Sequence, residues 1–122
     1  AGAILRFSKK EIINEFDNMA IDKSVHTILY QKVIARLRTK REERGLTQKQ
    51  LAGMLGLPQS YVSKLETCER RMDFIELRTI CNLLGISVVD FMQEVETEII
   101  PQVEKIEARK KEHEKNTNNI AE

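Results

Sequence analysis

The segment over residues 46–66, LTQKQLAGMLGLPQSYVSKLE, contains two short helical patterns separated by a sharp turn. Thr47 and Gln50 have the spacing of a capping box, so a helix is predicted to begin there. Gly56 can adopt the left-handed conformation that ends a helix, because it has no Cβ to clash. Pro58 suits the first turn of a second helix, where a missing N–H group costs no hydrogen bond. These signals limit the segment to two helices joined by a tight turn.

The second of these helices is predicted to carry a polar outward face. Val62 and Leu65 are three residues apart and face the interior together. The direction opposite them is occupied by Ser60, flanked by Ser63, Lys64 and Thr67, and Gln59 projects from the exposed first turn. This outward face is polar, with lysine as its single charge. Amides can pair with adenine, hydroxyls can donate or accept, and lysine can donate to guanine. A bland surface helix is the alternative, but the cap, turn and second helix together favour a helix-turn-helix that binds DNA.

The run TQKQLAGMLGLPQSYVSKLE resembles, without gaps, the lambda-repressor-like helix-turn-helix family, which includes phage repressors, Cro and Xre proteins. The resemblance continues through VIARLRTKREERGLTQ and ERRMDFIELRTICNLLGISVVDF and covers residues 32–94. It implies an all-α fold with a five-helix DNA-binding domain. It also implies a recognition helix over residues 58–66 that lies in the major groove of double-stranded DNA.

The resemblance further implies a role for ten polar side chains. The bases would be contacted by Gln59, Ser60, Ser63 and Lys64. The DNA backbone or flanking groups would be contacted by Thr47, Gln48, Tyr61, Thr67, Arg70 and Arg71, with Gln48 binding a phosphate. The chain departs from the family in one turn: after the recognition helix the family usually has a glycine, and this chain has Thr67-Cys68. A strained or differently shaped turn is expected there.

The formal net charge of +1 conceals an uneven distribution. Residues 31–72 contain ten basic and four acidic residues, a net charge of +6, whereas residues from 90 onward contain five basic and nine acidic residues, −4. A positive field on the segment that carries the motif favours contact with phosphates. The alternative is that Lys40, Arg41 and Arg44 complement the negative carboxyl end of their own helix.

Helical spacing and caps predict four more helices, over residues 8–20, about 22–44, 73–84 and from 87 to about 96. Pro101 is expected to interrupt the apolar pattern and to mark a boundary, after which Val103 and Ile106 continue a weak helical stripe. The final NTNNIAE has the composition of a frayed tail. The apolar positions assigned to the core of these helices are Val25, Ile28, Leu29, Val33, Leu37, Ile75, Leu77, Ile80, Cys81, Leu84, Val88, Val89, Phe91, Met92 and Val95.

Three regions are therefore predicted: an N-terminal helical extension over residues 1–24, the DNA-binding domain over 25–96, and a charged C-terminal helical extension or tail over 97–122. Each extension either packs on its own domain or builds a dimer interface, and we favour the interface. Four base-reading side chains are too few to select one site in a genome. A homodimer that binds an inverted-repeat operator is therefore expected.

Other classes of protein find little support. No stretch reaches the roughly 18 apolar residues needed to span a bilayer, and no signal peptide is recognisable, so a cytoplasmic protein of a bacterium or phage is expected. His26 and His113 lie far from each other and from any cysteine at ligand spacing, so no metal and no cofactor are predicted. No catalytic constellation is recognisable, which argues against an enzyme. Cys81 is predicted to be a buried apolar residue, whereas Cys68 beside Arg70 could respond to oxidants.

The leading hypothesis is a sequence-specific DNA-binding transcriptional regulator, a repressor that acts as a homodimer. The alternative is an antitoxin or other protein-interaction module that binds a partner protein through its terminal extensions and regulates its own gene. A third hypothesis is a scaffold that has kept the fold and lost DNA binding.

Overall fold

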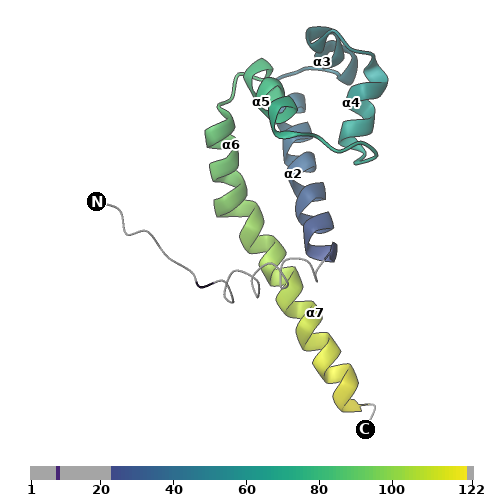
Figure 1. Cartoon of the computed structure of the whole chain (residues 1–122), viewed down its shortest axis with the longest axis vertical. Helices are drawn as coiled ribbons and strands as arrows, with labels where there is room; N and C mark the ends of the chain where they lie inside the picture. Colours follow the sequence, from purple (N-terminus) through teal and green to yellow (C-terminus); the bar gives the residue numbers. More distant parts are fainter. Residues whose placement is uncertain (1–7, 9–22, 121–122) are drawn as a thin grey trace, which may run out of the picture.

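A computed structural model describes residue 8 and residues 23–120, and all regular structure in that part of the chain is helical (Figure 1). The predicted helix over residues 8–20 lies outside the described residues apart from Ser8. The all-α class is confirmed: α2 to α6 are the five helices of the domain, and α7 is a helical extension. The elements are α2 (Lys23–Glu43), α3 (Gln48–Leu55), α4 (Gln59–Glu66), α5 (Phe74–Leu83), α6 (Val88–Glu94), the π-helix η1 (Val95–Ile99) and α7 (Ile100–Ile120).

The predicted helix signals operate where the sequence placed them. The Thr47 hydroxyl accepts from the Gln50 N–H at 3.0 Å, and the Thr47 N–H donates to the Gln50 side chain at 2.8 Å, which completes the capping box. Gly56 ends α3 with φ of 70°. Asp73 accepts from the Glu76 N–H at 2.7 Å and caps α5. The boundaries of these helices are thus set by local chemistry.

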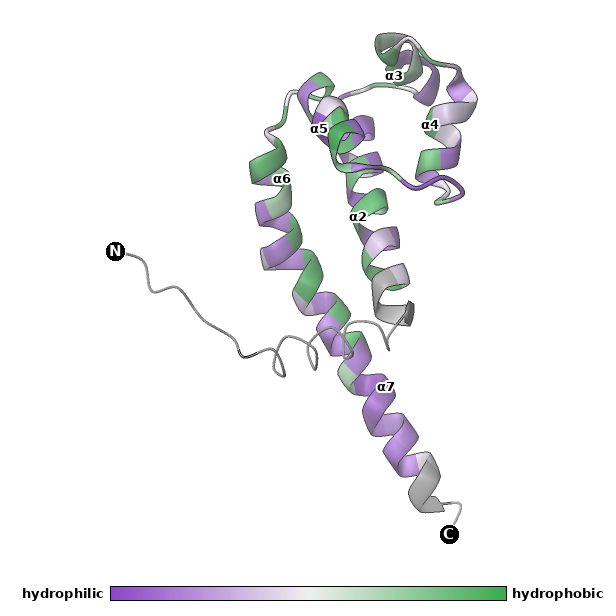
Figure 2. Ribbon diagram, viewed as in Figure 1, coloured by the Kyte–Doolittle hydropathy of each residue, from purple (hydrophilic) through white to green (hydrophobic). Residues whose placement is uncertain are grey.

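Two long antiparallel elements form the frame of the molecule. Helix α2 runs beside a continuous rod made of α6, η1 and α7, and the shorter helices α3, α4 and α5 close one end (Figure 1). The apolar faces of α2 and the rod are turned toward the core, and the rod becomes hydrophilic where it extends past α2 (Figure 2). The buried apolar side chains are Ile34, Leu37, Leu51, Ala52, Val62, Leu65, Ile80, Cys81, Leu84, Phe91, Val95, Ile99 and Val103.

Three core assignments made from the sequence are wrong. Ile75 is 66% exposed and Val89 is 71% exposed, and each lies in the first turn of its helix. Met92 is also exposed, whereas Ile34, which was not assigned to the core, is buried. The helical spacing of apolar residues marks out a broad apolar side of a helix. Which part of that side is buried depends on how the other helices pack against it.

Ion pairs fasten α2 to the rod along their shared edge. Lys40 donates to Glu94 at 2.7 Å, and Arg36 donates to Glu94 at 2.9 Å and also pairs with Glu98. The hydrogen bond from Lys40 lowers the pKa of Glu94 below its ordinary value, since it stabilises the carboxylate. These basic side chains of α2 are therefore committed to the rod.

The expectation that Pro101 interrupts the apolar pattern is wrong, because Pro101 lies in the first turn of α7, the rod continues through it, and Ile99 and Val103 on either side are both buried. The helix adapts just before the proline: the Ile100 N–H donates to the Val95 carbonyl, five residues back, and η1 is a π-helix. Proline has no N–H group for the carbonyl four residues earlier, so a local change of hydrogen bonding at this place has a physical cause.

The π-helix also keeps the buried side chains of α6, η1 and α7 on one side of the rod. Phe91, Val95, Ile99 and Val103 are spaced every four residues, and each is at most 3% exposed. In an unbroken α-helix this spacing would rotate Val103 by about 120° relative to Phe91. One extra residue in the π-turn reduces that offset to about 20°. The insertion therefore allows all four side chains to face α2 and the core.

The rod crosses the predicted domain boundary at residues 96 and 97 without a break, and Ile99 and Val103 beyond it belong to the core. The division into domains stays a prediction. The expected frayed tail is helical as far as Ile120. Beyond Val103 most described side chains are exposed, so the distal half of α7 stands out from the domain.

Deleting Thr97, an exposed residue in η1, is expected to give a folded protein with an unbroken α-helical rod. The deletion leaves Phe91 and Val103 about eleven positions apart, a spacing that an ordinary α-helix keeps on one face. Inserting an alanine after Thr97 is the matched change, and it should lower the free energy of unfolding by about 2 kcal/mol or more by rotating Ile99 and Val103 out of the core. Chemical denaturation followed by circular dichroism measures both. Equal stability of the two variants would contradict the register argument.

Candidate nucleic-acid interface

Helix α4 presents the predicted base-reading side chains on its open face. Gln59, Ser60 and Lys64 are exposed and Ser63 is half-buried, while the inward positions Val62 and Leu65 lie in the core. The outward and inward faces of α4 therefore agree with those predicted from its sequence. Contact with bases stays a prediction.

The N-terminal end of α3 lies beside α4 and places Gln48 and Thr47. The Gln48 amide donates to Glu66 at 3.0 Å, so its side chain is fixed against the C-terminal end of α4. An amide has two N–H donors, which leaves one for another acceptor. This donor and the backbone N–H groups at the start of α3 are the groups that would bind a phosphate there, and that contact stays a prediction. Thr47 is exposed but uses its hydroxyl in the cap.

A buried ion pair holds α4 to α2. Arg41 donates to both carboxylate oxygens of Glu66, at 2.8 and 2.9 Å, and to the carbonyl of Leu46 at 2.6 Å. The two side chains are only 7% and 9% exposed. The bonds to Glu66 raise the pKa of Arg41, so this guanidinium stays charged in the interior.

Sequence reasoning missed this pair, because Arg41 was counted among the groups facing phosphates or complementing a helix end. A signal for it was present. Glu66 follows Val62 by four residues and Leu65 by one, so it lies beside the inward stripe of a helix that has no other acid. A carboxylate on a buried face requires a basic partner.

Tyr61 and Arg70 are occupied by contacts within the protein. The Tyr61 hydroxyl donates to Glu76, and the Arg70 guanidinium lies over the Tyr61 ring, 4.4 Å from its centroid. Arg70 also donates to Glu76 at 2.7 Å. Arg71 lies over the ring of Tyr30, with its guanidinium carbon 5.0 Å from the ring centroid. The DNA contacts predicted for Tyr61, Arg70 and Arg71 stay predictions. In the structure all three side chains already contact other residues of the protein.

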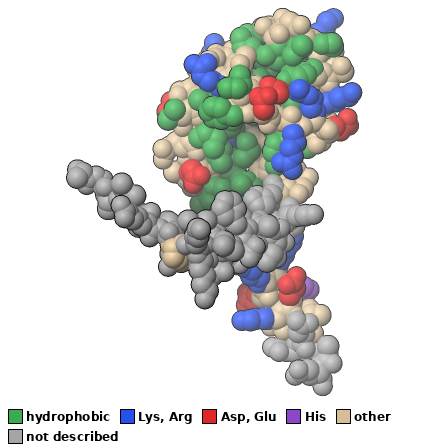
Figure 3. Space-filling view, viewed as in Figure 1, with side chains coloured by type: hydrophobic (Ala, Val, Ile, Leu, Met, Phe, Trp, Pro, Cys, Tyr) green, Lys and Arg blue, Asp and Glu red, His purple; other side chains and the backbone are tan. Residues whose placement is uncertain are grey.

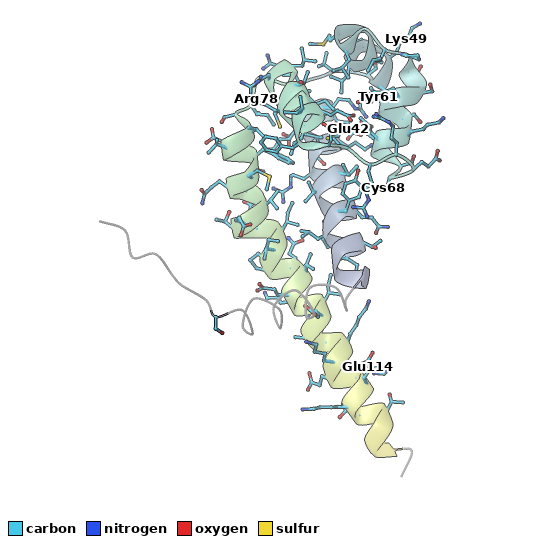
Figure 4. All side chains as sticks on the ribbon, in the orientation of Figure 1. Glu42, Lys49, Tyr61, Cys68, Arg78 and Glu114 are labelled. Carbon is cyan, nitrogen blue, oxygen red and sulfur yellow. The ribbon has the colours of Figure 1, made fainter. Side chains whose placement is uncertain are left out.

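The turn after α4 has the shape that the departure from the family suggested. Cys68 has φ of 62°, and it is the one residue other than glycine with positive φ in the described part of the chain. Its N–H donates to Leu65, and the Thr67 hydroxyl donates to the Ser63 carbonyl at 3.0 Å. Figure 4 labels Cys68 in this turn, directly after α4. The backbone therefore makes the left-handed turn that a glycine would make without cost.

Comparison with known proteins agrees with this geometry. A family model described as helix-turn-helix matches residues 37–91. A solved structure of an XRE-family like protein from Pseudomonas syringae pv. tomato str. DC3000 is 40% identical, with a TM-score of 0.59, and the match covers 61% of this chain and 90% of that one. The chain belongs to the XRE-like helix-turn-helix family.

A second solved structure, the clp gene regulator ClgR from Corynebacterium glutamicum, shares 27% identity with this XRE-like chain. Its TM-score is 0.56, and the match covers 67% of this chain and 87% of that one. No curated protein matched the chain. Both structural matches span most of the other chain, so the likeness includes the whole helix-turn-helix domain.

The positive charge available to a ligand of this XRE-like domain is smaller than the sequence count suggested. Five of the ten basic residues in the segment over 31–72 form ion pairs with acids of the protein: Arg36, Arg38, Lys40, Arg41 and Arg70. Four of these, Arg36, Arg38, Lys40 and Arg41, lie at the contacts of α2 with the rod or with α4. Lys49 and Lys64 are exposed on the two motif helices, and Figure 4 shows Lys49 on α3, projecting from the domain. The positive charge that a ligand would meet at the motif therefore comes from a few exposed side chains on α3 and α4.

The described residues include no group of three or more histidine, cysteine or acidic side chains arranged to hold a metal ion. No described helix is long and apolar enough to cross a membrane. Cys81 is fully buried, and burial raises the pKa of its thiol to about 11, so it is an unreactive core residue as predicted.

Replacing Cys68 by glycine is expected to raise the free energy of unfolding by about 1 kcal/mol, because glycine adopts positive φ without a Cβ clash. The control is Cys68→Ala, which removes the sulfur but keeps the Cβ, and it should bring no such gain. Chemical denaturation of the three proteins makes the comparison. A glycine variant no more stable than the alanine variant would show that this turn holds no strain.

Proposed function

We propose that this chain is a sequence-specific DNA-binding transcriptional regulator whose helix α4 enters the major groove. The observation that carries the proposal is the face of α4: exposed Gln59, Ser60 and Lys64 stand on a helix fixed to α2 by the buried Arg41–Glu66 pair. Base edges are recognised by polar side chains that are held in place. The gene regulator ClgR, one of the two solved structures that the chain resembles, supports the same assignment.

The start of α3 supplies the contact that sets the position of α4 on the duplex. A phosphate bound by the backbone N–H groups there and by the free donor of Gln48 would give register without sequence preference. Glu66 contributes indirectly, because its bond to Gln48 orients that amide. We propose that the regulator acts as a repressor, because a protein seated in the groove can exclude others from the same DNA. We expect it to act in the cytoplasm.

We further propose that the functional unit is a homodimer on an inverted repeat. The surface that supports it is an apolar patch on α5 and α6, formed by Phe74, Val89 and Met92, which are 65%, 71% and 39% exposed. Figure 3 shows hydrophobic side chains gathered on this side of the domain. Phe74 borders a shallow hollow of about 330 Å³, so a twofold copy can place each phenylalanine against the hollow of the other.

This patch differs from the surface expected from the sequence, where the terminal extensions were favoured for dimerisation. Contiguous exposed apolar groups on a small domain are typical of an interaction site. Two copies would also double the number of base-reading side chains, which one recognition helix needs for discrimination. The other apolar side chains exposed on α3 to α5, such as Ile75, lie outside the hollow.

Helix α7 supports a second candidate, in which a partner protein binds the terminal extensions, as in an antitoxin. Its distal half is charged and exposed, and Figure 4 shows Glu114 on the part that stands clear of the domain. The two functions are compatible, because DNA binding uses α3 and α4. Loss of a copurifying protein, but not of DNA binding, on removal of residues 107–122 would identify this role.

Replacing Gln59 or Lys64 by alanine is expected to cost about 1 to 3 kcal/mol of binding free energy on the selected site and to relax preference at one base pair. Replacing Gln48 by alanine should weaken binding to all sequences, because it removes a phosphate contact. Selection from a random DNA pool supplies the site, and titration of labelled duplexes gives the affinities. Unchanged affinities for all three variants would mean that α3 and α4 do not form the DNA interface.

Val89→Ser is expected to weaken the homodimer by about tenfold or more, because each of two copies loses a buried aliphatic contact. The matched control is Ile75→Ser, which changes another exposed β-branched residue, 66% exposed, outside the hollow. Sedimentation equilibrium measures the dissociation constants. If both variants dissociate alike, or neither does, the dimer uses another surface.

A further inference from the structure

Three side chains from three segments meet beside the first half of α4. Tyr61 belongs to α4, Arg70 to the following loop and Glu76 to the first turn of α5. Glu76 accepts from the Tyr61 hydroxyl and from Arg70 Nη1 at 2.7 Å, while the Arg70 guanidinium covers the Tyr61 ring at 4.4 Å. Each member therefore contacts both others, and Figure 4 shows Tyr61 on the side of α4 turned toward α5.

The triad formed by Tyr61, Arg70 and Glu76 is itself built on fixed parts. The Glu76 N–H donates to Asp73 at the start of α5, which holds the backbone beneath its carboxylate. Tyr30 of α2 accepts from the Met72 N–H at 2.9 Å and holds the loop from the other side. Burial and the bond to Glu76 raise the pKa of Tyr61, so its hydroxyl keeps the proton that it donates.

The triad gives α4 a second polar anchor. Glu66 fixes the last residue of the helix through Arg41, and Tyr61 fixes its third residue through Glu76. The eight residues of α4 span only about 12 Å, so two anchors near opposite ends restrict both its tilt and its rotation about its axis. Gln59 and Ser60 lie directly before Tyr61, and their direction depends on that second anchor.

We propose that Tyr61, Arg70 and Glu76 are positioning residues that set the orientation of the recognition helix and thereby its discrimination between DNA sequences. Arg70 acts through Glu76 and Tyr61, and it does not neutralise a DNA phosphate. This assignment rests on the proposed function in DNA binding. It replaces the phosphate contact that the sequence suggested for Arg70.

The charge balance of the triad supports this role. The Arg70 guanidinium is paired with a carboxylate, so the pair contributes no net charge to the surface that faces DNA. Moving Arg70 to a phosphate would break two contacts, the ion pair and the ring contact, and would leave the half-buried Glu76 carboxylate without its cation. Lys64 has no ion pair among the described residues of the protein and can release a counterion from DNA.

The test compares salt dependence with sequence discrimination. Full-length wild type, Tyr61→Phe and the double variant Arg70→Gln/Glu76→Gln are titrated with the selected duplex and with a scrambled duplex between 50 and 200 mM salt. Lys64→Gln is the control for a lost phosphate or base charge. Thermal melts confirm that each protein is folded at the temperature of the titration.

We expect Tyr61→Phe and the double variant to lower the ratio of specific to scrambled affinity by about tenfold, within the range known for coupled side chains. The slope of log affinity against log salt should stay at the wild-type value for both and become shallower for Lys64→Gln. A slope reduced by about 0.9 in the double variant would identify Arg70 as a phosphate contact and overturn the proposal. An unchanged specificity ratio would also overturn it. A wild type that binds neither duplex would instead remove the proposed function itself.

Discussion

The buried ion pair between Arg41 and Glu66 connects every part of the motif. Arg41 belongs to α2 and donates to Glu66 and to the carbonyl of Leu46, just before α3. Glu66 is the last residue of α4 and also accepts from Gln48 of α3. A buried charge is costly unless it is paired and fully hydrogen-bonded, and here both oxygens of the carboxylate have donors. Removing either partner would leave the other charge uncompensated in the interior. The pair therefore fixes the positions of α2, α3 and α4 relative to one another, and losing it would release all three.

This constraint links stability to recognition. Helix α4 is short, and an isolated helix of eight residues would not persist in water. It is ordered because Val62 and Leu65 are buried, and because polar bonds hold it at Glu66 and at Tyr61. The side chains on the exposed face of α4 are therefore not needed to hold the helix in place. A helix in which structural side chains and reading side chains are separate can change its reading side chains without losing the fold.

Local features of the fold followed from the sequence because their causes are local. A capping box needs residues three apart, and a left-handed turn needs a residue that tolerates positive φ, so Thr47 and Gly56 could be assigned directly. The sequence predicted a strained or differently shaped turn at Thr67-Cys68, and the structure gives its form, a Cys68 with positive φ. The outward direction of Gln59 and Lys64 also followed from helical geometry.

Features that depend on distant segments did not follow. Ile75 and Val89 fit an apolar stripe, but no helix covers them in the described part of the chain. Pro101 looked like a break, yet the rod continues, because a π-turn before it keeps Ile99 on the buried side. Such outcomes are decided by the summed burial of many side chains, to which a single residue contributes little.

The sequence by itself determined the all-α class, the ends of α2 to α5, and a polar outward face on α4 between two glycine- or cysteine-containing turns. Tertiary structure alone decided which charges are free to meet DNA. Arg41 and Arg70 look the same as Lys64 in a count of charge, but they are paired with Glu66 and Glu76. The reason is physical: an ion pair depends on a distance of a few ångströms between residues far apart in the chain, and only packing sets that distance.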